Sequence, residues 1–307
     1  MEPEASVLVI VLGPTAVGKS RVAVDLALRF GGEIVSGDSI QVYRGFDIGA
    51  DKPGPEARRG VPHHLIDIVG PDVQYTAADF VRDALAAAGG ITARGRLPIV
   101  AGGTGLYLKA LVDGLFPGPG RDPAVRDALE SEARERGLES LFRRLEAADP
   151  EYARKIRGQD RVRIIRALEV LETTGRPISA HFRETRSPVR DRTVLRLGLK
   201  LERERLCRRI DERVERMFAR GLVDEVRGLL ERGVPASAPP FRALGYNHVL
   251  RLLRGEIGRD EAVALTKTDT RRYAKRQMTW FRRMAGVAWF SPDDGPGLEQ
   301  YLQNQLQ

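Results

Sequence analysis

The sequence predicts an α/β protein: a P-loop-type parallel sheet core with helices on both faces, and a helical insertion domain. Three observations lead to this prediction. An apolar strand runs directly into a glycine-rich loop, further apolar strands alternate with helices, and a long middle segment has only helical patterns. We expect residues 1–114 and 191–307 to form the core and residues 115–190 to form the insertion.

The first element is a strand that ends in a phosphate-binding pattern. Residues 7–12 form an unbroken apolar run, which is typical of a parallel strand covered on both faces. The segment GPTAVGKS at residues 13–20 follows and fits G-x-x-x-x-G-K-[ST]. In such a loop the backbone N–H groups converge on an anion, Lys19 adds a positive charge, and the Ser20 hydroxyl can ligate Mg²⁺. We therefore predict a phosphate site.

Strands and helices then alternate along the core. The predicted helices cover residues 21–30 and 77–88, and the later strands lie at residues 32–38, 63–69, 96–104, 193–201 and 286–290. Ligands of open α/β sheets bind at the carboxyl ends of the strands. Asp38 ends the second predicted strand, so it is a candidate metal ligand, general base or N-cap.

The insertion begins after a segment rich in glycine and proline. Asp122 and Asp149 each stand before a proline, the arrangement of an N-cap followed by a first-turn proline. A further helix is expected to begin near Asp160 and to end around Gly175. These signals predict a helical segment without strands.

Charge is unevenly distributed between the two halves of the chain. The net charge is +8, yet residues 1–114 carry 11 Lys+Arg against 13 Asp+Glu, while residues 115–307 carry 39 against 29. The isoelectric point of 9.9 and this asymmetry fit a nucleic-acid partner for the second half, but composition alone fits a solvated basic surface as well. Arg209, Arg213, Arg216 and Arg220 form one basic helical stripe, which on pattern alone fits a solvated face equally well.

Composition also bears on location and assembly. Cys207 is the only cysteine, so the chain forms no internal disulfide, which fits a reducing, cytoplasmic compartment. No apolar run approaches the ~20 residues of a membrane span, so no membrane association is expected. We expect a monomer.

The loop pattern alone is typical of enzymes that hydrolyse ATP or GTP, but the rest of the sequence does not favour this activity. Such enzymes place an aspartate at the end of a later strand to hold Mg²⁺ through water. Here the strand at residues 96–104 ends in glycines and Thr104, and the guanine-reading sequence N-K-x-D is absent.

Eight segments together resemble the tRNA dimethylallyltransferases, also called tRNA isopentenyltransferases, and the resemblance spans nearly the whole chain. In order they are GPTAVGKS, GDSIQVYRGFDIGADKP, PHHLIDI, GGTGLYLKAL, DRVRIIRALEVLETTGRPIS, RGLVDEV, FRALGYNHV and TRRYAKRQMTWFRR. The resemblance implies transfer of the dimethylallyl group from dimethylallyl diphosphate to N6 of adenine 37 in tRNAs that read codons beginning with U.

The resemblance also implies roles for particular residues. Asp38 is the implied general base, and Thr104 lies at the reacting centre. Mg²⁺ is the implied cofactor, with Ser20 and Thr104 as its ligands. The implied diphosphate-binding residues are Gly13, Pro14, Thr15, Ala16, Val17, Gly18, Lys19, Ser20 and Arg213.

By the same resemblance, the insertion grips the anticodon stem-loop and the target adenine flips out of the stack into the site. The implied tRNA-binding residues are Asp38, Ser39, Ile40, Gln41, Thr104, Arg126, Arg163, Arg166, Lys275, Arg276 and Gln277.

Three other functions share part of this pattern. A P-loop small-molecule kinase has the same loop and could use Asp38 to activate a hydroxyl, but it leaves the basic C-terminal helices unexplained. An adenylate isopentenyltransferase uses the same donor with a free nucleotide, although the insertion and the AKRQMTWF segment favour tRNA. A tRNA-binding module without catalysis predicts decay of the loop or of Asp38, and both are intact.

Overall fold

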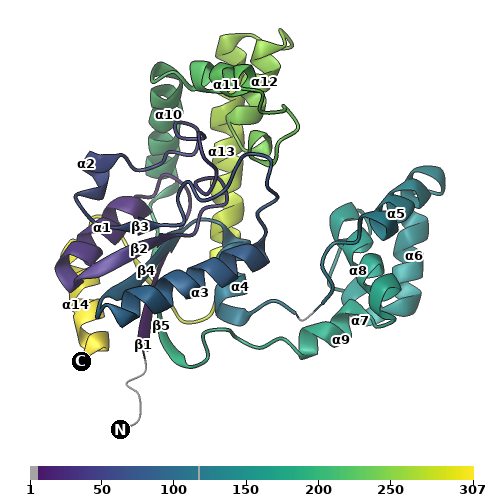
Figure 1. The fold of residues 1–307 in the computed structure, drawn as a ribbon, viewed down its shortest axis with the longest axis horizontal. Coiled ribbons are helices and arrows are strands. Elements are labelled where there is room, and N and C mark those ends of the chain that lie inside the picture. The colour runs from purple at the N-terminus through teal and green to yellow at the C-terminus, as the bar shows by residue number, and fades with distance from the viewer. Residues whose placement is uncertain (1–5, 117) are drawn as a thin grey trace. The chain divides into compact units, whose positions relative to one another are not determined.

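The computed structural model describes residues 6–116 and 118–307 of the chain. It divides into two compact units. The first, which we call the core unit, contains the chain up to Val112 together with Val189–Gln307, and the second, the insertion unit, is Asp113–Pro188. Figure 1 shows the ribbon coloured along the chain.

The core unit is built on one six-stranded, fully parallel sheet in the order β3-β2-β4-β1-β5-β6. The strands are β1 (Ser6–Leu12), β2 (Gly32–Ser36), β3 (His63–His64), β4 (Leu97–Gly102), β5 (Arg192–Leu199) and β6 (Val287–Phe290). The central strand β1 pairs with β4 on one side and β5 on the other. The predicted α/β class is confirmed.

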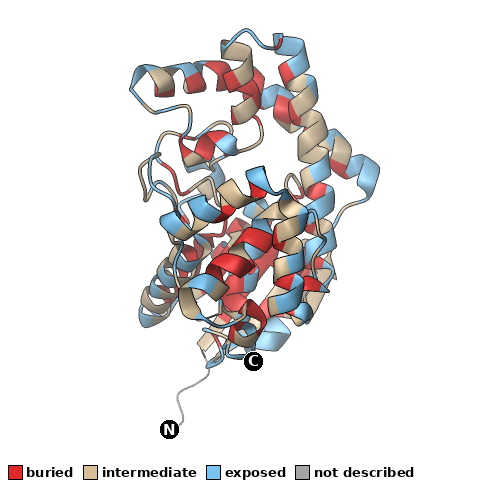
Figure 2. Ribbon diagram, turned by 90° about the vertical axis from the view of Figure 1, so that its right-hand side faces the viewer, coloured by how far each residue is buried: buried red, intermediate tan, exposed pale blue. Residues whose placement is uncertain are grey.

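Helices cover both faces of the sheet, which explains the continuous apolar run of β1. Leu8, Ile10 and Leu12 pack on the side of α3 (Ala77–Ala93) and α4 (Gly105–Asp113). Alternate residues of the same strand pack on the side of α1 (Lys19–Phe30) and α14 (Gly295–Leu306). Figure 2 shows buried residues on the sheet and on the helices around it.

Of the remaining helices of the core unit, α2 (Pro55–Arg58) lies in the loop after β2, and the others follow β5. These others are α10 (Arg203–Ala219), α11 (Leu222–Glu231), the 3₁₀ helix η1 (Pro239–Arg242), α12 (Tyr246–Leu253) and α13 (Arg259–Phe281). Helix α10 buries the stripe Leu206, Ile210, Val214 and Met217, as its spacing predicts. The basic stripe runs beside this buried face and is left for the site.

The insertion unit is a group of helices with its own apolar core. They are α5 (Pro123–Glu135), α6 (Leu138–Ala148), α7 (Pro150–Ala153), α8 (Arg161–Thr174) and α9 (Ile178–Arg183). The caps expected from the sequence are present. Asp122, Asp149 and Asp160 accept hydrogen bonds from first-turn N–H groups, and Gly175 ends α8 in the left-handed conformation at φ 68°.

Two strand predictions are wrong in their extent. The strand predicted at residues 63–69 is reduced to His63–His64, because Leu65 and Asp67 adopt positive φ values of 62° and 59° that break an extended run. The strand predicted to end at Asp38 ends at Ser36 instead, and Asp38 lies in the turn beyond it. The apolar Leu65 is thus buried in a loop and not in a strand.

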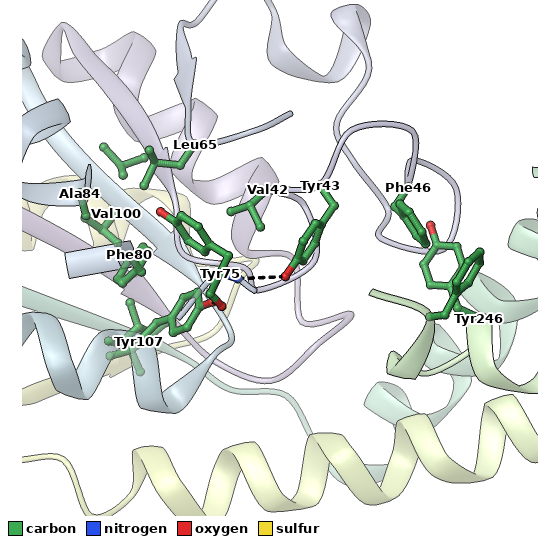
Figure 3. Packing of buried hydrophobic residues seen from close by; sticks show 14 of the residues in the cluster. Val42, Tyr43, Phe46, Leu65, Tyr75, Phe80, Ala84, Val100, Tyr107 and Tyr246 are labelled. Carbon is green, nitrogen blue, oxygen red and sulfur yellow. Dashed lines mark hydrogen bonds between the residues drawn. The ribbon is translucent and has the colours of Figure 1, made fainter. Parts of the chain in front are cut away.

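The segment between β2 and β3, which carries Asp38, is anchored by aromatic side chains. The Tyr75 backbone N–H donates to the Tyr43 hydroxyl at 3.3 Å, and the Phe46 ring meets the Tyr246 ring of α12 edge-on at 5.0 Å (Figure 3). These contacts fix the loop between the sheet and α12.

Within residues 6–116 and 118–307, no helix combines the length and apolar character needed to cross a bilayer.

Candidate active site

The glycine-rich loop joins β1 to α1 at the carboxyl edge of the sheet. Gly13 has φ 152°, and a Cβ there would lie 2.7 Å from the Leu199 carbonyl oxygen, so β5 leaves no space for a side chain. Gly18 caps α1 in the left-handed region at φ 107°. The N-terminus of α1 therefore opens onto the loop, as a phosphate site requires.

Lys19 supplies the positive charge of the loop. Its Nζ donates to the Pro14 carbonyl at 2.8 Å. Burial, followed by the charge of the nearby Arg213, lowers the pKa of Lys19 to about 8, although Asp38 and Asp51 act in the opposite direction. An anion bound here would stabilise the charged ammonium group in place of the water that burial removes.

Helix α10 places its basic stripe against this loop. Arg213 Nη1 donates to Thr15 Oγ1 at 2.7 Å, and its Nε lies 3.2 Å from Asp51 Oδ2. Arg209 Nη1 donates to the Val17 carbonyl at 3.2 Å. The stripe therefore faces the phosphate site over at least one turn of α10.

A polar cavity of about 340 Å³ lies between the loop and α10. Its lining residues are Ala16, Gly18, Lys19, Ser20, Arg21, Asp51, Arg209, Glu212, Arg213 and Arg216. The sequence analysis assigned only Arg213 of the stripe to the diphosphate. The spacing of Arg209 and Arg216 from Arg213, four and three residues, was the signal that could have added them.

Asp38 stands at the turn beyond β2. Its Oδ1 accepts hydrogen bonds from the backbone N–H groups of Ile40 at 2.8 Å and Gln41 at 3.4 Å. The carboxylate thus caps the turn, one of the roles open to it from sequence, and its orientation is fixed. It also lines the cavity that contains Thr104.

Thr104 follows β4 and bonds to the same turn. Its Oγ1 accepts from the Ser39 backbone N–H at 3.2 Å and lies 3.4 Å from Ser39 Oγ. The ends of β2 and β4 are therefore tied together by one hydroxyl. The two residues expected at the reacting centre, Asp38 and Thr104, line one cavity.

This second cavity, of about 290 Å³, adjoins the loop through Thr15 and Arg213. Its other residues include the apolar Val214, Met217 and Leu244. It can therefore accept a group that is apolar at one end and anionic at the other. No residue outside the core unit lines it among those described.

Tyr273 of α13 also lines the cavity, although the sequence analysis gave it no role. Burial raises the pKa of Tyr273 to about 12, and the negative charge of Asp38 adds to the effect. Its hydroxyl, which interacts with the side chains of Thr104 and Gln277, is therefore a neutral hydrogen-bonding group at physiological pH. Its place on one helical face with Gln277 was the available signal.

The residues expected to bind tRNA occupy different environments. Lys275 and Arg276 are exposed on α13. Gln277, in contrast, is buried and bonds to the loop and to the turn after β4. Gln41 is also engaged, since its Oε1 accepts from the Ser36 hydroxyl at 2.9 Å and its Nε2 donates to the Ala50 carbonyl at 3.3 Å.

In the insertion unit, two of the three expected arginines surround a buried carboxylate. Glu169 is fully buried, and its Oε2 lies 3.5 Å from Arg126 Nη1 and 3.0 Å from Arg166 Nη1. Arg166 also donates to the Pro119 carbonyl at 2.7 Å. Arg163 is exposed and, among the described residues, its side chain forms an ion pair with Asp160 alone, at 3.4 Å, so it is the most available of the three.

The loop also offers the ligands that Mg²⁺ prefers. The described residues contain no group of three or more His, Cys, Asp and Glu side chains able to hold a metal ion. Mg²⁺ in phosphate sites is commonly held by one or two protein oxygens together with substrate phosphates and water. Ser20, at the start of α1 beside Lys19, fits that mode, and Thr104 offers a second hydroxyl.

Comparison with known proteins agrees with this geometry. A family described as IPP transferase matches residues 41–284, and one described as isopentenyl transferase matches residues 6–67. The chain is 53% identical over 288 residues to the tRNA dimethylallyltransferase of Geobacter metallireducens, covering 94% of this chain and 93% of that protein. It is 50% identical to the tRNA dimethylallyltransferase of Thermomicrobium roseum, over 98% of this chain and 90% of that one.

Solved structures give the same result. The tRNA isopentenylpyrophosphate transferase of Bacillus halodurans superposes with a TM-score of 0.73 at 38% identity, covering 99% of this chain and 97% of that one. A eukaryotic dimethylallyltransferase acting on tRNA superposes with a TM-score of 0.81 at 29% identity, over 98% of this chain and 76% of that one. The chain therefore belongs to the tRNA dimethylallyltransferase family of transferases.

Proposed function

We propose that this chain transfers the dimethylallyl group of dimethylallyl diphosphate to N6 of adenine 37 of tRNA. The observation that carries the proposal is the junction of two cavities. A polar cavity with Lys19, Ser20 and Arg213 meets, at Arg213, a partly apolar cavity with Asp38 and Thr104. A diphosphate in the first places an allylic carbon in the second.

The reaction is a substitution at carbon 1 of the donor. The adenine N6 forms a bond to that carbon while the carbon–oxygen bond to the diphosphate breaks, and the electron pair leaves with pyrophosphate. Loop N–H groups, Lys19 and Arg213 stabilise the charge that builds on the leaving group. The products are N6-isopentenyladenosine in the tRNA and free pyrophosphate.

Asp38 accepts the proton that N6 loses. The turn N–H groups of Ile40 and Gln41 hold Oδ1 in place, so the carboxylate is oriented before the adenine arrives. General-base catalysis of this kind contributes about 10²–10⁴-fold. Thr104 and Ser39, which bond to each other beside Asp38, line the position of the adenine.

Ser20 and Thr104 would hold Mg²⁺ through their hydroxyl groups, and the metal would supply further neutralisation of the diphosphate charge. Lys19 and Arg213 bind the diphosphate directly.

The acceptor is the anticodon stem-loop of tRNAs reading codons that begin with U. Exposed Lys275 and Arg276 of α13 and Arg163 of the insertion unit contact its backbone, and the excess positive charge of residues 115–307 supports binding. The adenine flips out of the stack into the cavity at a cost of a few kcal/mol. We further propose that the protein is cytoplasmic and monomeric. Size-exclusion chromatography with light scattering tests the monomeric state.

The test is transfer of labelled dimethylallyl diphosphate, with Mg²⁺ or a chelator, to unmodified tRNA carrying A36-A37-A38. We expect label in this tRNA and none when position 37 is changed. Free AMP and ATP serve as parallel acceptors, and label on them would instead indicate an adenylate isopentenyltransferase. Phosphate transfer from ATP to a small alcohol, without dimethylallyl transfer, would indicate a kinase.

A further inference from the structure

We infer that Gln277 is a positioning residue that clamps the glycine-rich loop at residues 13–20, which we call the diphosphate loop, to the turn carrying Thr104. This inference rests on the proposed function for its kinetic test. The family resemblance groups Gln277 with its neighbours Lys275 and Arg276 as a tRNA contact, and those two neighbours are exposed. Its place in the structure points to a different task.

The side-chain amide joins two segments that are distant in sequence. Gln277 Oε1 accepts a hydrogen bond from the Thr15 backbone N–H at 2.9 Å, and Nε2 donates to the Gly103 carbonyl at 2.7 Å. The residue is only 5% exposed. A neutral amide offers an acceptor and a donor on one rigid planar group, so it satisfies both backbone groups at once.

The packing leaves little freedom for this group. A Cβ built on Gly103 would lie 2.5 Å from Gln277 Nε2 and 3.3 Å from Lys19 Nζ. The absence of a side chain at Gly103 therefore lets the amide approach the backbone beside the lysine that serves the diphosphate. Gln277 occupies the space between the two parts of the site.

Each bonded segment carries a reacting group. Thr15 accepts the hydrogen bond of Arg213 through Oγ1, and Gly103 directly precedes Thr104, which bonds to the Ser39 backbone. One amide thus links the diphosphate loop, the turn after β4 and, through Thr104, the turn that contains Asp38. Loss of the clamp lets the leaving group and the base shift relative to each other, and small misplacements of this kind cost much of the rate.

The decisive measurement separates the kinetic constants of the two substrates. Gln277→Met keeps the volume and removes both hydrogen bonds. We expect kcat to fall about ten- to a hundredfold, the effect of leaving buried polar groups unpaired, and the KM for dimethylallyl diphosphate to rise. The KM for tRNA should stay unchanged. Lys275→Gln and Arg276→Gln are the matched controls, and both should raise the KM for tRNA alone.

A pH profile adds a readout that a general loss of packing does not move. In Gln277→Glu, the protonated carboxyl group donates to Gly103 and accepts from Thr15, as the amide does, whereas the carboxylate cannot donate. The activity of Gln277→Glu relative to wild type should therefore rise as pH is lowered from 8 to 5.5. The same ratio for Gln277→Met should stay flat.

The outcomes are distinct. A rise in the KM for tRNA alone in Gln277→Met, or a flat pH ratio near one in Gln277→Glu, overturns the clamp. Should Gln277→Met fail to melt cooperatively, the pH ratio of Gln277→Glu decides. Calorimetric binding of pyrophosphate without tRNA tests the clamp even if wild type transfers no label: weaker binding in Gln277→Met supports it, and unchanged binding refutes it.

Discussion

Asp38 has two tasks, because one carboxylate both caps a turn and accepts a proton in the proposed reaction. Its Oδ1 is held by Ile40 and Gln41, whereas basicity is a property of the whole group. Sequence reasoning left the roles of cap and base open. The structure shows that a cap does not exclude a base, because the same residue lines the cavity with Thr104.

This double role gives a test in which one variant keeps the cap. Asp38→Asn retains an acceptor oxygen for the turn but is not a base, so we expect kcat to fall about 10²–10⁴-fold while tRNA affinity is retained. Asp38→Ala should lose the same catalysis and also destabilise the turn. Single-turnover transfer and tRNA binding by filter retention measure the two effects. Wild-type turnover by Asp38→Asn would remove the base assignment.

Lys19 gives a prediction about pH. Its pKa is lowered to about 8, so in the free protein it is charged below pH 8 and loses its proton above that value. Pyrophosphate pairs with the charged form, so its affinity should fall as pH rises from 8 to 9.5, with proton uptake on binding. Calorimetry in two buffers of different ionisation enthalpy measures that uptake. Lys19→Met, which should bind weakly without the uptake, corrects for titration of pyrophosphate itself.

At the scale of elements, α10 shows what periodicity predicts and what it leaves open. The spacing of Leu206, Ile210 and Val214 predicts the buried face, and the basic stripe runs along the adjacent face. Whether such a stripe meets solvent or a ligand depends on which element lies opposite, and that is a tertiary property. Here the diphosphate loop lies opposite Arg209 and Arg213.

The stripe can be divided experimentally. Arg209→Gln should raise the KM for dimethylallyl diphosphate about tenfold, because Arg209 lines the polar cavity and bonds to Val17 of the loop. Arg220 lies at the end of the same stripe but outside that cavity, so the KM of Arg220→Gln for dimethylallyl diphosphate should equal that of wild type. Equal effects of the two substitutions would mean that net charge, and not position, determines donor binding.

Helix α8 of the insertion unit depends on a buried charge. Glu169 is fully buried between Arg126 and Arg166 and also accepts from the Asp122 backbone N–H at 2.9 Å. Glu169→Ala should reduce the free energy of unfolding by about 3 kcal/mol, the low end for a buried ion pair, since water reaches both arginines.

The control for this prediction lies one turn along the helix. Glu172 pairs with Arg144 at a more exposed position, so Glu172→Ala should cost at most about 1 kcal/mol. Urea unfolding followed by circular dichroism compares the two. Similar losses in both variants would show that burial of Glu169 adds nothing.

At the scale of the whole molecule, the parallel sheet and its covering by helices on both faces follow from the sequence pattern, whereas the strand order and two further features required the structure. The segment at residues 63–69 has strand composition, yet only His63–His64 form a strand, because positive φ at Leu65 and Asp67 turns the chain. Gln277 has the sequence neighbours of an RNA contact, yet a side chain on a helix can face inward directly after two exposed ones. Local composition does not determine either outcome.

Charge gives a prediction at the same scale. Residues 115–307 carry 39 Lys+Arg against 29 Asp+Glu, so tRNA binding should release counterions and weaken steeply with salt. We expect log Kd against log salt concentration to be linear, with Lys275→Gln lowering the slope by about one contact. The affinity for pyrophosphate should depend far less on salt concentration. A salt-independent tRNA affinity would contradict a phosphate-dominated interface.

The position of β5 in the sheet has a consequence for biosynthesis. Strand β1 leaves the ribosome early, but its partner β5 pairs Arg192 with Ser6, about 190 residues later. At typical elongation rates, β1 waits roughly 10 to 40 s with that edge unpaired. An unpaired apolar strand edge recruits other chains, whereas the helices between them can form from local contacts as they emerge. A nascent chain that must wait for its own central partner is therefore a natural client for chaperones.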